Sequence, residues 1–257
     1  MTDSRHAFRG NLGALTGVAP IAPTPFTDAG DLDLEGQRRV MDCMVDQGVD
    51  AICILANYSE QFALTDAERR EILDVCLQRV NGRVPVIVTV SHYSTRVASE
   101  RARDAAAAGA AMLMLMPPYH GATLRAEEAQ FIEHVAAVAD ASRLPIMVQD
   151  APMSGTPLSV GLLLRLGAAV PLVRAFKVEV AGAATKLRSL IDAGGPAVVE
   201  PFDGEESITL LADLDAGATG TMPSAMLRDL IRPIVTNYLA GDRSAAISGY
   251  EDRKSTR

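Results

Sequence analysis

The sequence predicts an α/β protein in which eight strand–helix units form a closed (β/α)8 barrel, and three observations lead to this prediction. Short β-rich apolar runs alternate with longer amphipathic runs rich in Ala, Leu and Arg, which is typical of parallel strands joined by helical crossovers. The alternation continues nearly to the end of the 257 residues, and that length suits such a barrel. No GxGxxG or GxxxxGK[ST] turn follows the first apolar run, which disfavours the competing doubly wound sheet.

The eight predicted strands are apolar runs of five to seven residues. In chain order they are Val18 to Pro23, Ala51 to Ala56, Val84 to Val90, Ala111 to Met116, Pro145 to Gln149, Leu172 to Lys177, Ala197 to Phe202 and Ala218 to Met222. The helices that follow are expected to begin at Leu34, Asp66, Thr95, Arg125, Ser159, Ala181, Glu205 and Ala225.

Local signals support these boundaries. Thr65 and Glu68 have the spacing of a capping box at the start of a helix. Gly48, Gly109 and Gly217 each lie between a helix and the next strand, where the residue after a helix must accept a positive φ. We expect residues 1–16 to be an N-terminal arm, residues 17–240 to be the barrel, and residues 241–257 to be a short, polar, weakly helical tail.

Composition excludes several classes of protein. The formal net charge is −8, which is unfavourable for binding nucleic acid. No apolar run is long enough to cross a bilayer, and the first residues lack the apolar core of a signal peptide. We therefore expect a cytoplasmic protein without a membrane partner. The three cysteines lack CxxC spacing and stand in apolar runs, which predicts buried free thiols.

The active site of such a barrel lies at the carboxyl ends of its strands. Polar residues at the ends of the predicted strands are therefore the candidates for binding or catalysis. They include Asn57, Tyr58, Ser59, His92, Tyr119, Gln149, Asp150, Lys177, Glu205 and Thr219.

Lys177 is the first catalytic candidate. The chain has only three lysines and carries its other basic charges as arginine, yet Lys177 ends an apolar strand. Burial favours the neutral amine, which attacks a carbonyl to form a Schiff base. The alternative is a strand-end lysine that extends to solvent. Tyr119 follows a Pro-Pro pair and is either a proton relay or a packed tyrosine at the rim.

The histidines do not have the spacing of a metal site. Of the four, only His92 and His120 lie in loops after strands, and neither is part of an HxH or HExxH pattern. We expect no metal. The alternative is a metal held by His92, His120 and a carboxylate such as Asp150 or Glu205.

The order of these residues resembles the dihydrodipicolinate synthase and N-acetylneuraminate lyase superfamily over about residues 14 to 250. The resemblance is carried by the turn 24–26 (Thr-Pro-Phe), the loop that ends at Glu60, Tyr119 after the fourth strand and Lys177 at the sixth. It implies a metal-free, homotetrameric Schiff-base lyase with no cofactor. By position, Lys177 matches the imine-forming lysine, and Tyr119 matches the loop tyrosine that often reaches toward a neighbouring subunit's site. The family's C-terminal helical extension is expected to be largely missing here.

Two departures from the family pattern narrow the branch. Gln149 stands where the family's proton-relay tyrosine is found, and residues 153–156 lack the arginine that binds a second carboxylate in the synthases. Residues 54–62, 116–123 and 145–152 are similar to the branch of L-2-keto-3-deoxyarabonate dehydratases.

This resemblance implies dehydration of 2-keto-3-deoxy-L-arabonate, or a related 2-keto-3-deoxy sugar acid, to 2-oxoglutarate semialdehyde. Lys177 would form the imine and Tyr119 would relay protons. Asn57, Tyr58 and Ser59 would hold the C1 carboxylate, with His92, Gln149, Asp150, Glu205 and Thr219 as further substrate-binding candidates. Two alternatives are a pyruvate-dependent aldolase or synthase, and a degenerate barrel that binds keto acids without turnover.

Overall fold

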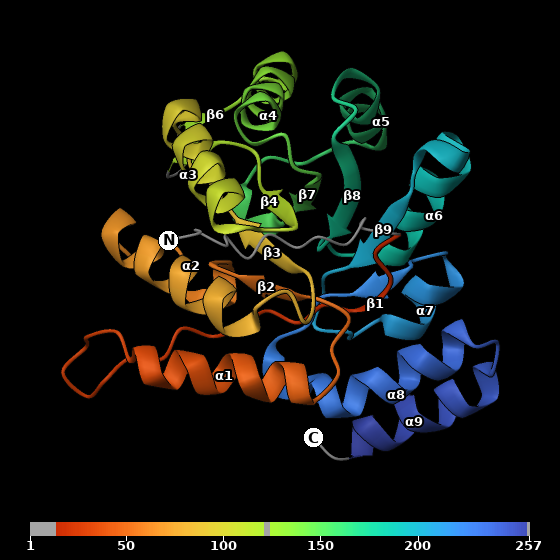
Figure 1. The fold of residues 1–257 in the computed structure, drawn as a ribbon. Helices are drawn as coiled ribbons and strands as arrows, with labels where there is room; N and C mark the ends of the chain where they lie inside the picture. The colour runs from red at the N-terminus through yellow and green to blue at the C-terminus, as the bar shows by residue number, and fades with distance from the viewer. Residues whose placement is uncertain (1–13, 121–123, 256–257) are drawn as a thin grey trace.

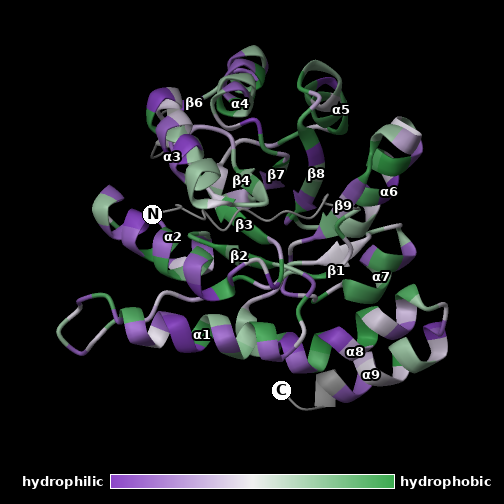
Figure 2. Ribbon diagram, in the orientation of Figure 1, coloured by the Kyte–Doolittle hydropathy of each residue, from purple (hydrophilic) through white to green (hydrophobic). Residues whose placement is uncertain are grey.

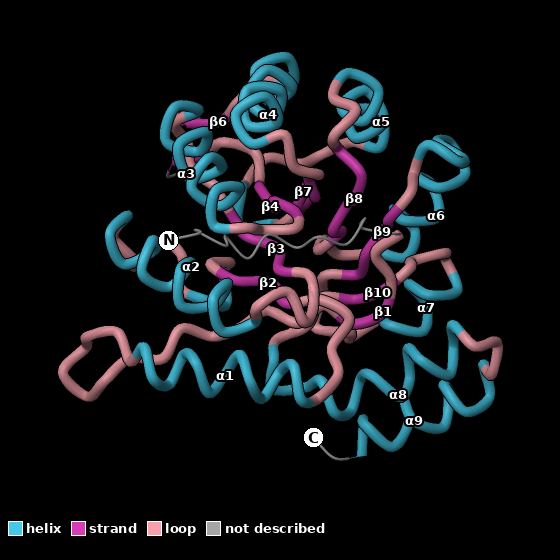
Figure 3. Tube along the Cα trace, in the orientation of Figure 1, coloured by secondary structure: helices cyan, strands magenta, loops and turns pink. Residues whose placement is uncertain are grey.

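Eight parallel strands form a ring that is surrounded by helices (Figures 1 and 3). The computed structural model describes residues 14–120 and 124–255. Residues 1–13 of the predicted N-terminal arm therefore lie outside the described part of the chain.

The strands of the ring are short and lie within or beside the predicted runs. They are β1 (Gly17–Val18), β2 (Ile52–Ile54), β3 (Val86–Thr89), β4 (Met112–Leu115), β7 (Ile146–Asp150), β8 (Val173–Val178), β9 (Glu200–Asp203) and β10 (Gly220–Thr221). Their order is β1-β10-β9-β8-β7-β4-β3-β2, and a parallel bridge between Ile21 and Cys53 joins the two edges. The predicted (β/α)8 barrel is confirmed.

A helix follows each strand of the ring. The helices are α1 (Leu34–Asp46), α2 (Asp66–Val80), α3 (Thr95–Ala108), α4 (Glu128–Ser142), α5 (Val160–Ala169), α6 (Ala183–Gly194), α7 (Leu210–Asp215) and α8 (Arg228–Leu239), followed by α9 (Arg243–Ser255). The capping box of Thr65 and Glu68 is present, and Gly48, Gly109 and Gly217 have positive φ angles.

The largest differences from the predicted boundaries lie in the loops at the carboxyl ends of strands. The segment before α4 forms an antiparallel hairpin of β5 (Tyr119–His120) and β6 (Leu124–Arg125) rather than the start of a helix. Residues 205–209 form a loop, because Glu206 and Ser207 adopt positive φ angles that a right-handed helix does not accept. Helix α7 therefore begins at Leu210 and not at Glu205.

Apolar residues fill both the inside of the ring and the layer beneath the helices, while the outer helix faces are hydrophilic (Figure 2). Side chains that alternate along the strands fill the inside, among them Cys53, Met114, Ala175 and Phe202, because successive residues of a strand point to opposite faces. All three cysteines are free, as predicted. The prediction that all are buried is wrong for Cys43, which lies on the solvent side of α1 and is exposed.

Helix α9 occupies most of the segment that the sequence predicts to be a polar, weakly helical tail. It packs antiparallel to α8 (Figure 1). Ala246 of α9 is fully buried in the cluster that α7 and α8 also line, which explains why a hydrophilic segment stays helical here. Within the described residues, no helix is both long and apolar enough to span a bilayer.

Candidate active site

Lys177 is fully buried inside the barrel, near the carboxyl end of β8. Its ammonium nitrogen Nζ lies 2.6 Å from Oε2 of Glu179, on the residue just past the strand. The backbone just after β9 runs close by: a Cβ atom at Gly204 would lie 3.0 Å from Cε of Lys177. A lysine held in this way has one carboxylate partner and no contact with bulk water.

Gln149 is the second partner of Glu179. Strands β7 and β8 pair Gln149 with Lys177 in register, so both side chains point into the barrel. The amide Nε2 of Gln149 donates to Oε2 of Glu179 over 2.8 Å, and Gln149 is fully buried. One carboxylate oxygen is therefore shared by the lysine ammonium and the glutamine amide.

The predicted carboxylate loop forms a short 3-10 turn over Asn57–Ser59. The side chain of Ser59 serves the fold, because its hydroxyl donates to the carbonyl of Ala22 over 2.6 Å. Asn57 is fixed by Gln61, whose Nε2 donates to Oδ1 of Asn57 over 2.6 Å. The first N–H groups of a helical turn have no partner within the turn, so those of Asn57 and Tyr58 are suited to an anion.

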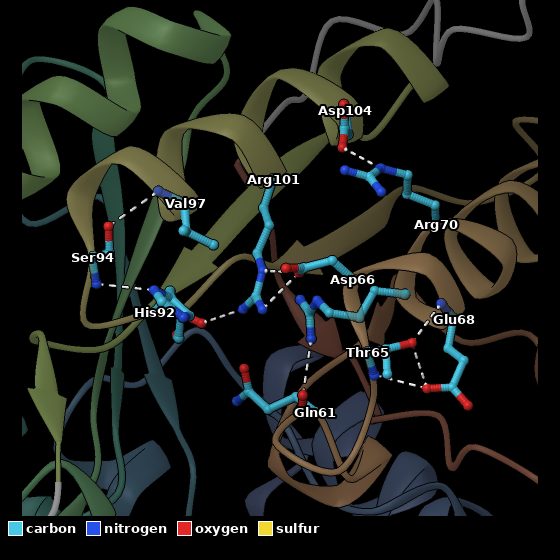
Figure 4. Close-up of polar contacts among 12 residues, drawn as sticks. Gln61, Thr65, Asp66, Glu68, Arg70, His92, Ser94, Val97, Arg101 and Asp104 are labelled. Carbon is cyan, nitrogen blue, oxygen red and sulfur yellow. Dashed lines mark hydrogen bonds and ion pairs between the residues drawn. The ribbon is translucent and has the colours of Figure 1, made fainter.

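Arg69 of α2 fixes this loop through hydrogen bonds to backbone carbonyls. Its guanidinium donates to the carbonyl of Gln61 over 3.3 Å and to that of Thr89, at the end of β3, over 2.7 Å. Burial and the neighbouring Arg101 lower the pKa of Arg69 to about 9. Figure 4 shows Arg101 reaching from α3 to Asp66 of α2 beside Gln61 and His92. This cluster fixes the loops that follow β2 and β3.

The hydroxyl of Tyr58 lies on the other side of the site, beside acidic residues. Burial raises the pKa of Tyr58 to about 12, together with the charge of Glu206, a hydrogen bond to it and the charge of Glu179. A neutral phenol is therefore the form of Tyr58 at neutral pH. Its side chain lies beside the carboxylates of Glu206 and Glu179, where a negatively charged C1 group would be repelled. Only the backbone N–H of Tyr58 is therefore left for the predicted role at C1.

Buried acidic residues lie behind the loop that follows β9. Asp203 accepts hydrogen bonds from Oγ1 of Thr221 over 2.5 Å and from the backbone N–H of Glu205 over 2.9 Å, and burial raises its pKa. Asp213 of α7 accepts from Oγ1 of Thr209 over 2.6 Å. Burial, aided by Asp203 and Glu205, raises the pKa of Asp213 to about 7.

His92 and Tyr119 line a pocket of about 380 Å³, together with Gln61, Phe62 and Tyr93. Nδ1 of His92 accepts a hydrogen bond from the backbone N–H of Ser94 over 2.9 Å, and burial beside Arg101 lowers its pKa. The ring of Tyr119 packs edge-on against Phe62, and burial raises the pKa of its hydroxyl. These two residues stand at the rim rather than against Lys177.

The structure does not bring two predicted residues to the site. Asp150 follows Gln149 on β7 and so points to the opposite face, where its carboxylate lies 2.5 Å from Nζ of Lys186 on α6. Thr219 precedes β10, and its hydroxyl donates to the carbonyl of Pro201 over 3.2 Å at the amino end of the strands. Glu205 stays near the mouth, and burial and the charges of Asp203 and Glu179 raise its pKa.

The described residues contain no group of three His, Cys, Asp or Glu side chains placed to hold a metal ion. The side chain of His120, one member of the alternative metal set, lies outside the described part of the structure. The sequence places Glu179 and Glu206 after strands but gives no reason to pair them with Lys177 and Tyr58. Their partners become visible only once the strand register is known.

A (β/α)8 barrel with a buried lysine at its mouth is the framework of this protein, and comparison with known proteins identifies its family. The chain belongs to the dihydrodipicolinate synthetase family, whose model matches residues 14–253. The resemblance predicted from the sequence is confirmed.

Similar proteins include enzymes that are named for different activities. The chain is 54% identical over 235 residues to an L-2-keto-3-deoxyarabonate dehydratase from Azospirillum brasilense, covering 91% of this chain and 76% of that protein. It is 32% identical to a 4-hydroxy-tetrahydrodipicolinate synthase from Salinibacter ruber, covering 82% and 69% of the two chains. A family member from E. coli K12, solved in complex with pyruvate, superposes with a TM-score of 0.86 at 25% identity, covering 93% of this chain and 80% of that one.

Proposed function

We propose that this protein is a Schiff-base lyase that dehydrates 2-keto-3-deoxy-L-arabonate to 2-oxoglutarate semialdehyde. The observation that carries the proposal is that the Lys177 ammonium and the Gln149 amide both donate to the same carboxylate oxygen of Glu179. The 54% identity to a protein named as that dehydratase supports the choice of substrate.

Lys177 is the nucleophile. Its ammonium group is already bonded to Glu179, so transfer of one proton to that carboxylate frees the amine to attack the C2 ketone of the substrate. Loss of water from the adduct gives a protonated imine between Lys177 and C2. The imine is the electron sink of the reaction, and it takes the place of a separate cofactor.

Glu179 is the base that removes a proton from C3. It lies within hydrogen-bond distance of the nitrogen that becomes the imine, so its carboxylate reaches the carbon next to C2. Gln149 accepts no proton near neutral pH, but its amide holds Glu179 in place through the 2.8 Å hydrogen bond. Gln149 thus positions the base in an enzyme that lacks the family's tyrosine there.

The remaining steps balance without an oxidant. Removal of the C3 proton gives an enamine, whose electrons expel the C4 hydroxyl as water once that oxygen receives a proton. Loss of a proton from C5 and return of a proton to C3 move the double bond to C4 and C5. The resulting enol becomes the aldehyde, and hydrolysis of the imine releases the product and Lys177.

The C1 carboxylate binds the backbone N–H groups of Asn57 and Tyr58 at the start of the 3-10 turn. Ser59 and Arg69 contribute by fixing the loop. Glu205 and His92 lie at the rim, where they contact the hydroxylated part of the substrate, and Tyr119 relays protons at the same rim.

We also propose that the protein is a cytoplasmic homo-oligomer, a tetramer as its family resemblance implies. Phe62 and Tyr93 have 57% and 50% of their surface exposed beside Tyr119, and apolar surface of this kind favours burial against another subunit. Free thiols, one of them the exposed Cys43, suit a reducing compartment.

The test is incubation with 2-keto-3-deoxy-L-arabonate, with the semialdehyde and pyruvate measured in the same samples. We expect the semialdehyde as product, and borohydride with substrate should attach a covalent adduct to the wild-type protein. Lys177→Arg should abolish both, whereas Lys186→Arg keeps the ion pair to Asp150 and should retain both. Pyruvate as the main product would show an aldolase instead. An adduct of unchanged yield in Lys177→Arg would refute the assignment of the nucleophile.

A further inference from the structure

The loop between β9 and α7 holds an unfavourable backbone conformation in a fixed place. Glu206 and Ser207 have φ angles of 52° and 58°, and such left-handed residues cost energy unless their surroundings impose the conformation. The hydroxyl of Ser207 lies 3.0 Å from that of Thr221 on β10, and Thr221 is bonded in turn to Asp203. The fixed loop presents the carboxylate of Glu206 to the mouth of the barrel.

That carboxylate joins three loops of the mouth. It accepts hydrogen bonds from the backbone N–H of Ser224 over 2.8 Å and from its hydroxyl over 3.2 Å, after β10. The hydroxyl of Tyr58, after β2, is also close enough to this carboxylate for Glu206 to raise its pKa. Within the described residues, Glu206 has no ion pair with a lysine or arginine. Hydrogen bonds rather than a cation therefore hold its carboxylate at the mouth.

Two more carboxylates share this end of the site. Glu179 lies close enough to influence both Tyr58 and Glu205 electrostatically, while its own charge is balanced by the ion pair with Lys177. A second anionic group on a substrate would be repelled here, because it meets Glu205 and Glu206, neither of which has an ion pair with a lysine or arginine among the described residues. A neutral hydroxyl meets no such cost.

Tyr58 is suited to bind that hydroxyl. A phenol that donates its hydrogen to Glu206 keeps its oxygen lone pairs free to accept from a substrate hydroxyl. Its side chain is 46% exposed, so it stands between the closed interior around Lys177 and solvent.

We propose that Tyr58 and Glu206 form a specificity subsite for the end of the substrate farthest from C1. The subsite accepts an uncharged hydroxymethyl group and rejects a carboxylate or phosphate at that position. Glu206 acts as a positioning residue for Tyr58 and as the source of the repulsion. This inference rests on the proposed function, since it assumes that a keto acid bound to Lys177 extends toward Tyr58.

The experiment compares two competitive inhibitors, pyruvate and 2-oxoglutarate, on wild type and on Glu206→Gln. Both are 2-keto acids, and 2-oxoglutarate carries a carboxylate where the proposed substrate carries its hydroxymethyl group. We expect 2-oxoglutarate to bind wild type at least about 10-fold more weakly than pyruvate, and Glu206→Gln to reduce this ratio about 10-fold. Glu206→Asp, which keeps the charge, should preserve most of the discrimination. Equal changes for the two inhibitors in Glu206→Gln would overturn the proposal.

Tyr58→Phe tests the attractive part of the subsite. We expect KM for 2-keto-3-deoxy-L-arabonate to rise about 5- to 10-fold, as for loss of one hydrogen bond, while the dissociation constant of pyruvate changes less than about twofold. Tyr238→Phe, which removes a tyrosine–carboxylate contact on α8, is the matched control and should change neither. An unchanged KM in Tyr58→Phe, or an equal loss of pyruvate binding, would overturn the proposal.

Inhibitor binding is also measurable without turnover. Borohydride traps pyruvate as a covalent adduct on Lys177, and a competing inhibitor lowers the yield of that adduct. If wild type traps pyruvate but dehydrates no keto-deoxy acid, the proposed function fails while the ratio of the two inhibitors still decides the specificity subsite. Circular dichroism of each variant shows whether the barrel is folded. If Glu206→Gln does not fold, Glu206→Asp and Tyr58→Phe still test the subsite.

Discussion

Asp213 makes the stability of this barrel depend on pH near neutrality. Its carboxyl is fully buried on α7. One oxygen accepts a hydrogen bond from Thr209, and the other has no partner among the described residues. Burial, with the negative charges of Asp203 and Glu205, raises the pKa of Asp213 from 3.8 to about 7. The folded protein therefore keeps a proton at pH values where the unfolded chain has lost it.

The sign of the effect follows from proton binding. Between about pH 4 and pH 7 the folded state binds more protons at this site than the unfolded state, so stability falls as the pH rises through that range and levels off above it. One pKa unit corresponds to about 1.4 kcal/mol. The rise in the pKa of Asp213 therefore costs the folded state roughly 4 kcal/mol above pH 7.

Asp213→Asn removes the ionisable group and keeps an oxygen that accepts from Thr209. We expect a gain in the free energy of unfolding of about 4 kcal/mol at pH 8 and less than half of that at pH 5. The chain has no tryptophan, so urea unfolding is best followed by circular dichroism, at one protein concentration throughout.

Asp192→Asn, at an exposed position of α6, is the matched control and should change stability by less than about 0.5 kcal/mol at either pH. The reasoning about Asp213 is refuted if its asparagine variant is stabilised equally at pH 5 and pH 8, or is less stable than wild type at pH 8.

Three further predictions follow from particular contacts. Glu179→Gln should lower kcat for dehydration by about 10²- to 10⁴-fold, as for loss of a general base. Long-time assays of product formation measure the residual rate, and a kcat of this variant above one tenth of the wild-type value would contradict the role of Glu179. Gly220→Ala should destabilise the barrel by more than about 2 kcal/mol, because its Cβ would lie 2.3 Å from the carbonyl oxygen of Gly17; a thermal melt equal to wild type would contradict this. Thr65→Ala should cost about 1 kcal/mol through loss of the capping box, measured by urea unfolding, whereas Thr65→Ser should restore most of it.

The fold was accessible from the sequence because strand and helix patterns differ in period. Runs such as 84–90 and 111–116 are continuous and apolar, as expected for strands covered on both faces. The strand ends were harder to place, because apolar character continues past the last ladder hydrogen bond. Thr219 was a poor candidate for a different reason: it is the second residue of the predicted run 218–222, so it lies before β10, at the end opposite the mouth.

Some residues of the site are predictable from the sequence and others are not, for a related reason. Lys177 stood out because a lysine in an apolar strand of an arginine-rich chain is unusual. The choice between Gln149 and Asp150 depends on which one shares the inward face with Lys177, and that is set by register with β8. A one-residue change of register reverses which side chains face inward, so neighbouring polar residues at a strand end are not distinguished by sequence.

The sequence does not predict that Glu206 lies beside Tyr58, because residues around Glu206 have the pattern of a helix start. Residues 205–211 begin with two acidic residues and end with two leucines, a pattern that favours a helix N-terminus. The tertiary hydrogen bonds of Ser207 and Glu206 impose left-handed backbone there instead. Such an override is a property of the assembled mouth and not of the local segment.

The pairing of β1 with β10 has a consequence for synthesis of this protein on the ribosome. Gly17 pairs with Gly220 in register, so the first strand made waits for the last one before the ring closes. Until then β1 and β9 are edge strands, and closing so long a loop carries an entropy cost. Nascent chains are thus exposed to wrong pairing for most of translation. In the finished protein, the amides of this seam, among them that of Ala19 bonded to the carbonyl of Thr221, should be among the first barrel amides to exchange with solvent.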